Sequence, residues 1–320
     1  NADSNGGNIS FKVDRSSIRQ GNAVIAIKDV SDAILWSWHV WVTDEDINNV
    51  IEITNHQNVK YNFMPVNLGQ CDGNTITYEE RSCKVKFIAG DQSKEITIKQ
   101  LANVIATGSN APFYQWGRKD PLYPSNGMGN TTKIWYDKEG IPSTANPMKG
   151  TFSAGNDCIK NCILNPNLMH NRYNGDYTYY NLWSADNKTT SANDNPVNKT
   201  IYDPCPVGFK LPASNAFTGF TTTGESVSSS TQVNGTWSSS EKGWYFYTNS
   251  EKTQSIFFPA LGYRSYSTMR PGSIGTQGCF WSAHPVAKGN NYYLRTSSVD
   301  VQPTYMVDRG FGYALRPCQD

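Results

Sequence analysis

Residues 202–212 read YDPCPVGFKLP, and this stretch organises the rest of the chain. Pro204, Pro206 and Pro212 each fix φ and remove an amide donor. The stretch therefore cannot be the interior of a helix or of a central strand. We expect a rigid, extended segment that leads into the next element and holds Cys205 stiffly between two prolines.

A short amphipathic helix is predicted directly after this stretch, at residues 213–220. Ser214 and Asn215 are residue types that cap helices, and Phe217 and Phe220 share a helical face at i, i+3 spacing. A second short helix is predicted at 157–164, from apolar residues at i, i+3 and i+4, and a proline just beyond would end it.

The seven cysteines favour disulfides over zinc, because no paired CxxC spacing is present. Disulfides imply an oxidising compartment such as the periplasm or the cell surface. We expect Cys205 to pair with Cys318, which would tie the tail to the opening stretch, and Cys71 to pair with Cys83 around a candidate strand. Their odd number leaves one thiol over.

Cys158 and Cys162 also invite pairing. Within a regular helix, however, their side chains are poorly disposed for a disulfide. The pair is therefore expected to form only if that helical turn is irregular.

Charge and composition exclude some classes of partner. In a chain of 320 residues, 28 basic and 27 acidic residues leave a net charge of +1, and no run of Lys and Arg is present. This argues against a nucleic-acid partner. Charged residues make up only 17%, while Tyr (18) and Trp (9) are frequent, which is typical of extracellular β-rich proteins. No stretch approaches the roughly 20 apolar residues of a transmembrane segment.

The first 57 residues read as β structure. Residues 34–42 alternate with the period of a strand that is covered on both faces. Its tryptophans, Trp36, Trp38 and Trp41, are favoured as sheet-core aromatics over a sugar-stacking surface. His39 between them is expected to be a hydrogen-bonded structural histidine.

Three motifs in order resemble a known bacterial surface domain. Residues 203–212, 278–282 (GCFWS) and 312–318 (GYALRPC) resemble the Fibrobacter succinogenes major paralogous domain of Bacteroidetes, which is similar in fold to C-type lectins and to the formylglycine-generating enzyme. Residues 34–44 (ILWSWHVWVTD) and 114–121 (YQWGRKDP) resemble the fimbrillin-type adhesins of Bacteroides.

The resemblance implies a mainly β fold with a few short helices (α+β). We expect an N-terminal β-sandwich-like part at 1–57, incomplete at its N-terminus, and a C-type lectin-like domain at 58–320. A β-hairpin insertion is expected around 71–108, with strands at 75–80, 83–88 and 95–100 and a turn at Gly90-Asp91. If the hairpin instead completes the first sheet, the boundary moves to about 108.

Further short strands are predicted toward the C-terminus. They cover residues 243–248, 255–259, 279–283, 292–296 and 312–316. A lectin-like fold presents its ligand on the loops around its last strands, where aromatic faces suit sugar rings. The ligand-binding residues that this implies are Tyr263, Arg264, Tyr266, Trp281, His284 and Asn290, although Trp281 also suits the core.

No metal site is expected. The Glu-Pro-Asn and Gln-Pro-Asp type motifs of calcium-dependent lectins are missing from the expected places. The only crowded set of oxygen ligands is Asn193-Asp194-Asn195.

The enzyme alternative rests on Cys279 and Cys318, because formylglycine-generating enzymes use paired cysteines near the C-terminus. No flanking histidine or cationic cluster is present to lower a thiol pKa. None of the four histidines lies in a nucleophile motif. We therefore expect no catalysis and no cofactor.

The expected function is that of a non-catalytic adhesin, a tip or accessory subunit of a Bacteroidetes fimbria that binds a glycan or protein through its C-terminal loops. Its other partners would be fimbrial subunits, docked by strand addition. The expected location is extracellular, at the cell surface or fimbria, after export across the inner membrane and with anchoring at the outer membrane. A stand-alone glycan-capture lipoprotein is the alternative, and a cysteine-dependent enzyme is the third.

Overall fold

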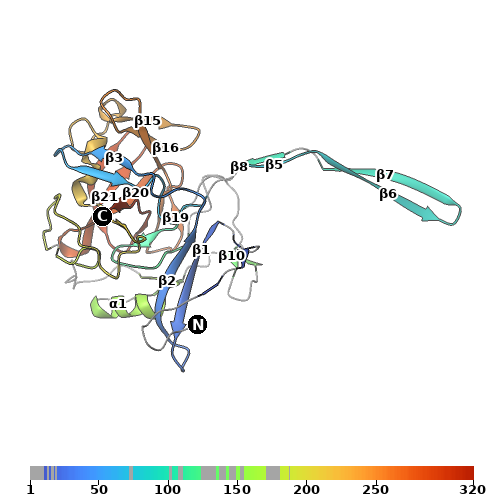
Figure 1. Ribbon diagram of the computed structural model, residues 1–320, viewed down its shortest axis with the longest axis horizontal. Helices are drawn as coiled ribbons and strands as arrows, with labels where there is room; N and C mark the ends of the chain where they lie inside the picture. Colours follow the sequence, from blue (N-terminus) through green and yellow to red (C-terminus); the bar gives the residue numbers. More distant parts are fainter. Residues whose placement is uncertain are drawn as a thin grey trace.

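The computed structural model has a rounded body from which a long two-stranded arm projects (Figure 1). It is mainly β, as predicted. Within the described part of the chain, none of the helices has both the length and the apolar character that a membrane crossing requires. The structure describes residues 11–12, 14–15, 18, 20–71, 75–100, 103–106, 111–123, 135–136, 142–143, 149–151, 155–170, 181–186 and 188–320.

The N-terminal strands β1 (Gly21–Lys28) and β2 (Ile34–Val42) form an antiparallel hairpin. The predicted strand at 34–42 is therefore confirmed. His39 is a hydrogen-bonded structural histidine, as expected, because its Nε2 lies 2.8 Å from Asn22 Oδ1 and its Nδ1 lies 2.9 Å from the Tyr114 hydroxyl. The contact with Asn22 lies within the hairpin, whereas the contact with Tyr114 attaches β2 to the body.

The predicted boundary at residue 57 cuts through one structural unit. β3 (Ile51–Thr54) and β4 (Lys60–Phe63) form a hairpin on either side of it. Ile53 and Phe63 are both buried in the same cluster of the body, because the two strands turn their apolar residues toward one core. The hairpin therefore belongs to the C-terminal part of the chain.

The opening stretch provides the outermost strand of this sheet. The order is β14 (Phe209–Lys210), β24 (Cys318–Gln319), β4, β3, so the tail of the chain lies between β14 and β4. Cys318 is opposite Lys210 on one side and Phe63 on the other. Strand pairing therefore attaches the tail to the opening stretch.

Side chains fix the rigid conformation predicted for the opening stretch. The buried Asp203 carboxylate accepts the amide hydrogens of Cys205 (2.8 Å) and Leu211 (3.1 Å). The ammonium of Lys199 donates to three backbone carbonyls of the stretch, those of Cys205, Pro206 and Phe209. Polar contacts thus replace the missing secondary structure.

The helix predicted at 213–220 is a 3₁₀ helix, η2 (Ser214–Phe220), with Phe217 and Phe220 fully buried as expected. The expected capping is wrong. The N-cap position is Ala213, which has no side-chain cap, and the Ser214 hydroxyl instead donates to the carbonyl of Asn193 at 3.1 Å. The helix is held in place by its buried face.

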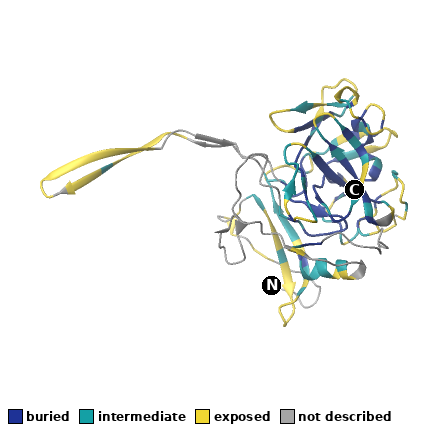
Figure 2. Cartoon of the chain, turned by 180° about the vertical axis from the view of Figure 1, so that it is seen from behind, coloured by how far each residue is buried: buried dark blue, intermediate teal, exposed yellow. Residues whose placement is uncertain are grey.

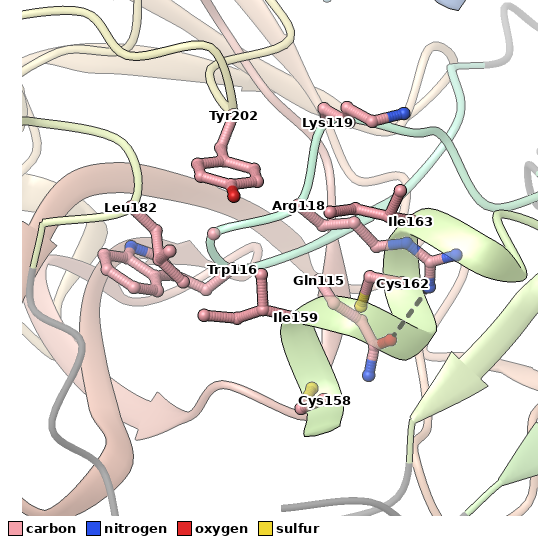
Figure 3. Close-up of a pocket in the computed structure, with 11 residues that line it drawn as sticks. Gln115, Trp116, Arg118, Lys119, Cys158, Ile159, Cys162, Ile163, Leu182 and Tyr202 are labelled. Atoms are coloured by element: carbon pink, nitrogen blue, oxygen red, sulfur yellow. Dashed lines mark hydrogen bonds between the residues drawn. The ribbon is translucent and has the colours of Figure 1, made fainter. Parts of the chain in front are cut away.

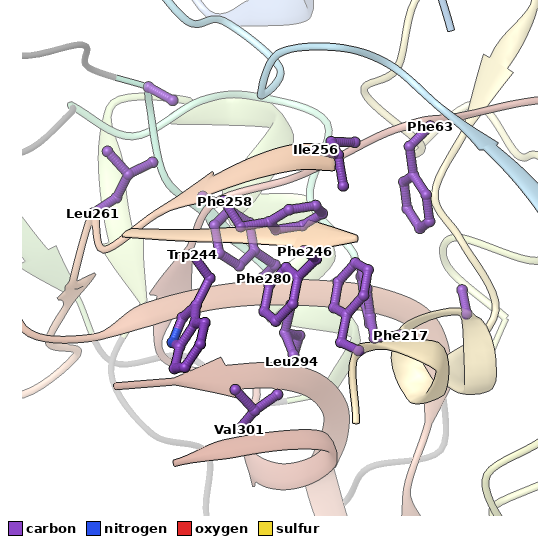
Figure 4. Packing of buried hydrophobic residues seen from close by; sticks show 14 of the residues in the cluster. Phe63, Phe217, Trp244, Phe246, Ile256, Phe258, Leu261, Phe280, Leu294 and Val301 are labelled. Atoms are coloured by element: carbon purple, nitrogen blue, oxygen red, sulfur yellow. The ribbon is translucent and has the colours of Figure 1, made fainter. Parts of the chain in front are cut away.

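The body's main core is aromatic (Figure 4). Phe258 lies at its centre, with ring centroids 5.0 Å from Phe220 and 4.9 Å from Phe280, both edge to face. Phe220 stacks on Phe246 at 3.9 Å. Such pairs stabilise a core beyond the area they bury.

Three further sheets build the body around this core. Their strand orders are β15 (Gly235–Ser238), β16 (Gly243–Tyr247), β17 (Ser255–Pro259); β20 (Gly278–Pro285), β21 (Asn290–Thr296), β22 (Val301–Asp308); and β19 (Pro271–Gly272), β18 (Tyr263–Arg264), β23 (Gly312–Tyr313), β9 (Tyr114–Gln115). Sequence reasoning missed β22 because Pro303 lies within it. β22 is an outer strand of its sheet, where proline is tolerated.

The remaining elements are short. α1 (Gly155–Leu164) is the helix predicted at 157–164. The others are β10 (Trp135–Tyr136) paired with β11 (Pro142–Ser143), β12 (Lys149–Thr151) paired in parallel with β13 (Leu168–His170), and the 3₁₀ helices η3 (Ser230–Gln232) and η4 (Ala287–Gly289).

The arm comprises four strands in two successive ladders. β5 (Thr75–Tyr78) pairs with β8 (Asn103–Ala106), and β6 (Arg81–Ala89) pairs with β7 (Gln92–Gln100) farther out. The predicted turn is present, with Gly90 at φ 60°, a conformation that favours glycine. Figure 2 shows that the outer ladder is exposed almost throughout, in contrast to the buried centre of the body.

Candidate functional site

Three of the six predicted ligand residues lie inside the body. Arg264 is 1% exposed, and Trp281 and His284 are 0% exposed. Arg264 donates to the carbonyls of Tyr123 and Met269, Trp281 Nε1 donates to the carbonyl of Tyr114, and His284 Nδ1 accepts the amide hydrogen of Ser214. Their polar atoms bind backbone groups of the core, so the assignment of these three to a ligand surface is wrong in this structure.

The other three predicted residues are half-buried. Tyr263 and Tyr266 pack edge to face against Phe311, with centroid distances of 5.4 and 4.8 Å. Asn290 begins β21 and pairs with Asp308 in the sheet. The structure therefore does not bring the six residues together around one ligand.

A polar cleft lies instead across the sheet that holds the tail. Its cavity volume is 270 Å³, and it is bounded by β4, β14, β24 and the loop at 194–197. The polar side chains in its lining are Lys60, Tyr61, Asn62, Asp194, Asn195, Lys210, Gln319 and Asp320. We call this feature the polar cleft.

Asp194 fixes one wall of the polar cleft. Its carboxylate accepts hydrogen bonds from the Tyr61 hydroxyl at 2.7 Å, Asn55 Nδ2 at 2.6 Å and Asn215 Nδ2 at 2.8 Å. Burial, and then the bond to Asp194, raises the pKa of Tyr61. A carboxylate that already serves three donors is a structural anchor, which argues against the calcium interpretation of Asn193-Asp194-Asn195.

The polar cleft is suited to binding. The side chains of Lys60, Lys210 and Asn62 can donate hydrogen bonds to a ligand, and those of Gln319 and Asp320 can accept them. Because a hydroxyl group both donates and accepts, a ligand with several hydroxyls could bond to both kinds of side chain. Its thiol, Cys318, is unreactive because burial raises its pKa to about 12, which leaves it protonated at neutral pH. Sequence reasoning missed the site because residues far apart in the chain build it.

A second, smaller cavity of 40 Å³ lies beside α1, lined by Trp116, Arg118, Cys158, Cys162 and Tyr202 among others (Figure 3). Arg118 anchors this region. Its guanidinium donates to Gln115 Oε1 at 3.2 Å and to carbonyls that follow α1, those of Asn165, Pro166 and Leu168.

Among the described residues, one group of side chains has the spacing of metal ligands: Cys158, Cys162 and His170, whose ligand atoms lie within 4.8 Å of one another. The hydrogen bond with Cys158, and then burial, raises the pKa of the Cys162 thiol, while the charge of Arg118 opposes the rise. A search for CxxC pairs alone could not find this group, since it combines CxxxC with a more distant histidine.

None of the seven cysteines, which all lie within the described residues, is joined in a disulfide in the structure. Cys205 and Cys318 are both buried, and burial raises the pKa of each thiol, with Cys318 adding to the rise at Cys205. Their disulfide stays a prediction. Cys71 precedes β5 and Cys83 lies on β6, so the strand predicted between them is present. Their disulfide likewise stays a prediction.

The enzyme alternative finds no support at Cys279. This thiol is 1% exposed, and burial raises its pKa to about 12. It therefore stays protonated and shielded at neutral pH, whereas a nucleophilic cysteine needs an accessible thiolate.

Comparison of the chain with protein-family models, with curated proteins and with solved structures finds no match.

Proposed function

We propose that the chain is a non-catalytic cell-surface adhesin, a tip or accessory subunit of a Bacteroidetes fimbria that binds a glycan or protein on a host or neighbouring cell. The motifs at 203–212, 278–282 and 312–318 support the lectin-like assignment of the body. The observation that carries the proposal is the arm, which projects away from the body and exposes apolar side chains.

One face of the arm is apolar. Val85 is opposite Ile96 and Cys83 is opposite Ile98, and Phe87 continues the same face of β6. Phe87 is 57% exposed, Ile98 52% and Ile96 42%. An isolated two-stranded hairpin is marginally stable in water, and exposed apolar surface of this kind marks an interaction site. A partner that covers this face would stabilise the arm.

The occupant that we propose is a neighbouring fimbrial subunit. Within the described chain, β6 and β7 pair only with each other, so each has one edge free of ladder partners. Such edges accept an added strand, and the alternating apolar side chains supply the specificity. The opposite face carries the exposed ion pair Lys84–Glu95 (2.8 Å), which suits contact with solvent.

The ligand end of the adhesin is assigned to the polar cleft. Its volume accommodates a sugar ring, and it lies on the body at β4, β14 and β24, whereas the arm carries the assembly surface. Its mixed donors and acceptors favour hydroxyl-rich ligands. The polar cleft replaces the C-terminal loops as the proposed binding site, because half of the loop residues are buried.

The ligand is tested with the full chain on a glycan array, followed by the variant Asn62→Ala/Lys210→Ala. We expect the variant to lose at least about tenfold in affinity, since each lost hydrogen bond to a ligand contributes about 1 kcal/mol. The control Lys252→Ala changes an exposed lysine outside the cleft and should bind like the parent. Binding that is unaffected by the double variant would remove the cleft from the proposal.

Assembly is tested with Phe87→Ser/Ile98→Ser, which makes the apolar face of the arm polar. We expect this variant to lose incorporation into isolated fimbriae. The matched control is Ile88→Ser, which changes a 70% exposed apolar residue on the opposite face. Equal incorporation of both variants would contradict the assembly role of that face.

The glycan-capture lipoprotein remains the second candidate because the polar cleft is built without the arm. It predicts that deleting the arm leaves glycan binding and cell-surface retention unchanged and that no fimbria contains the chain. The adhesin predicts loss of fimbrial incorporation with glycan binding retained.

A further inference from the structure

The fold brings two cysteines and a histidine to one point beside α1. Cys158 and Cys162 are four residues apart on the helix and so share one of its faces. His170 is the last residue of β13, the strand that follows α1. Their three potential ligand atoms, two sulfurs and an imidazole nitrogen, all lie within 4.8 Å of one another.

The backbone of His170 is held firmly. Gln115 Oε1 accepts its amide hydrogen at 2.9 Å, and Gln115 Nε2 donates to its carbonyl at 2.7 Å. The same Gln115 oxygen accepts a hydrogen bond from Arg118, whose guanidinium also binds the carbonyls that follow α1. The helix and the histidine are thereby positioned by one buried polar network, as metal sites require of their surroundings.

We propose that Cys158, Cys162 and His170 bind a thiophilic divalent cation, zinc in the first place. Zn–S distances near 2.3 Å and Zn–N distances near 2.0 Å place tetrahedral ligand atoms roughly 3.5–3.8 Å apart. The observed limit of 4.8 Å needs only small side-chain rotations to reach this. Two thiolates and a neutral imidazole balance the charge of the ion.

The two cysteines could form a disulfide with each other instead of binding a metal, but the geometry of α1 disfavours that bond. Both residues lie within a regular ten-residue helix, where i, i+4 side chains are poorly disposed for the required dihedral angle. A metal accepts the same two sulfurs without distorting the helix.

The fourth ligand position has room for water. Cys158 and Cys162 both line the 40 Å³ cavity of Figure 3, whereas one water needs only about 10–15 Å³. The ion would thus have three protein ligands and one water. It would link α1 to β13, and its binding free energy would add to the stability of this region.

The test uses the full chain, reduced and then freed of reductant, with Co²⁺ as a spectroscopic probe and Zn²⁺ as competitor. We expect one equivalent of Co²⁺ to give a thiolate-to-metal charge-transfer band and tetrahedral d–d bands, and Zn²⁺ to abolish them. Zn²⁺ should also raise the melting temperature, and a chelator should reverse the rise.

The variants Cys158→Ser, Cys162→Ser and His170→Asn should each weaken Zn²⁺ binding by more than the 10–100-fold that loss of an outer-shell partner costs. The matched control is Cys83→Ser, which removes an exposed thiol on the arm and should bind like the parent.

Circular dichroism checks that the variants fold, and the half-buried Cys158 is the position least expected to disturb folding. The proposal would be overturned if the parent gave no cobalt band, or if the band survived in Cys158→Ser/Cys162→Ser. It would also be overturned if Cys158 and Cys162 formed a disulfide and the protein still bound no metal once that disulfide was reduced.

Discussion

The body and the arm are built from similar strands but differ in what covers them. Phe258 in β17 is 0% exposed and is surrounded by aromatic rings, whereas Phe87 in β6 is 57% exposed. β6 alternates apolar and polar residues over most of its length, whereas β17 (SIFFP) is apolar at every position after Ser255. The difference shows that a strand forms from either pattern, while the burial of its apolar side chains depends on whether another layer packs against it.

The largest expected difference between body and arm comes from making the same substitution in both. Phe258→Ala should lower the free energy of unfolding by about 3–5 kcal/mol, because it leaves a cavity among packed rings. Phe87→Ala should change it by less than about 0.5 kcal/mol. Urea denaturation followed by tryptophan fluorescence measures both, and similar losses would mean that the arm folds onto the body in solution.

Arg316 offers the next largest expected effect. Its guanidinium, 1% exposed, donates to Asn67 Oδ1 at 2.7 Å and to the carbonyls of Pro65 (2.8 Å) and Phe257 (2.7 Å). Burial lowers its pKa to about 9. Arg316→Lys keeps the charge but loses the planar fork, so we expect about 3 kcal/mol of destabilisation. Arg81→Lys on the exposed arm should have almost no effect in the same denaturation assay.

Acid should destabilise the body through its buried histidines. Burial lowers the pKa of His284 and of His39 to about 4, against about 6.5 when unfolded. The unfolded chain then binds protons first, so this contribution is fully present above pH 6.5 and is lost as the pH falls toward 4. The slope is about 1.4 kcal/mol per pH unit for each histidine.

Urea denaturation between pH 7.5 and 4.5 checks this slope. The variant His284→Asn, whose Oδ1 can replace Nδ1 as acceptor for the Ser214 amide, should remove about half of it. An unchanged slope would show that carboxylates and not His284 govern the acid response.

Removal of the arm should change the stability of the body least of all. Replacing residues 75–106 with a short Gly-Ser linker should leave the melting temperature of the body within about 2 °C, since the outer ladder lies clear of the buried core. Differential scanning calorimetry measures this. A large drop would indicate that the arm stabilises the body, contrary to its exposed surface.

Much of the fold was predictable because local pattern determined it. Alternation predicted β2, short strand-like runs on either side of the Gly90-Asp91 turn predicted β6 and β7, and the spacing of apolar residues predicted α1. The boundary at residue 57 cuts the β3–β4 hairpin, whose place in the body depends on the pairing of β4 with β24, a long-range contact that sequence patterns do not show. Pro303 hid β22, since sequence alone does not show that a strand lies at the edge of a sheet.

The site was much less predictable. Arg264 and His284 are polar, and their residue types suggested a surface, yet the fold satisfies them with backbone partners inside the core. The polar cleft depends on the tail lying between β14 and β4, which no local pattern encodes. Likewise, the spacing of Cys158 and Cys162 was visible, but the approach of His170 was not.

The central position of β24 has a consequence for how the chain is made. Asn62 and Gln319, which meet across the sheet at 3.5 Å, are 257 residues apart in sequence. The sheet cannot be completed until residue 319 has left the ribosome, and contacts of such long range make folding slow.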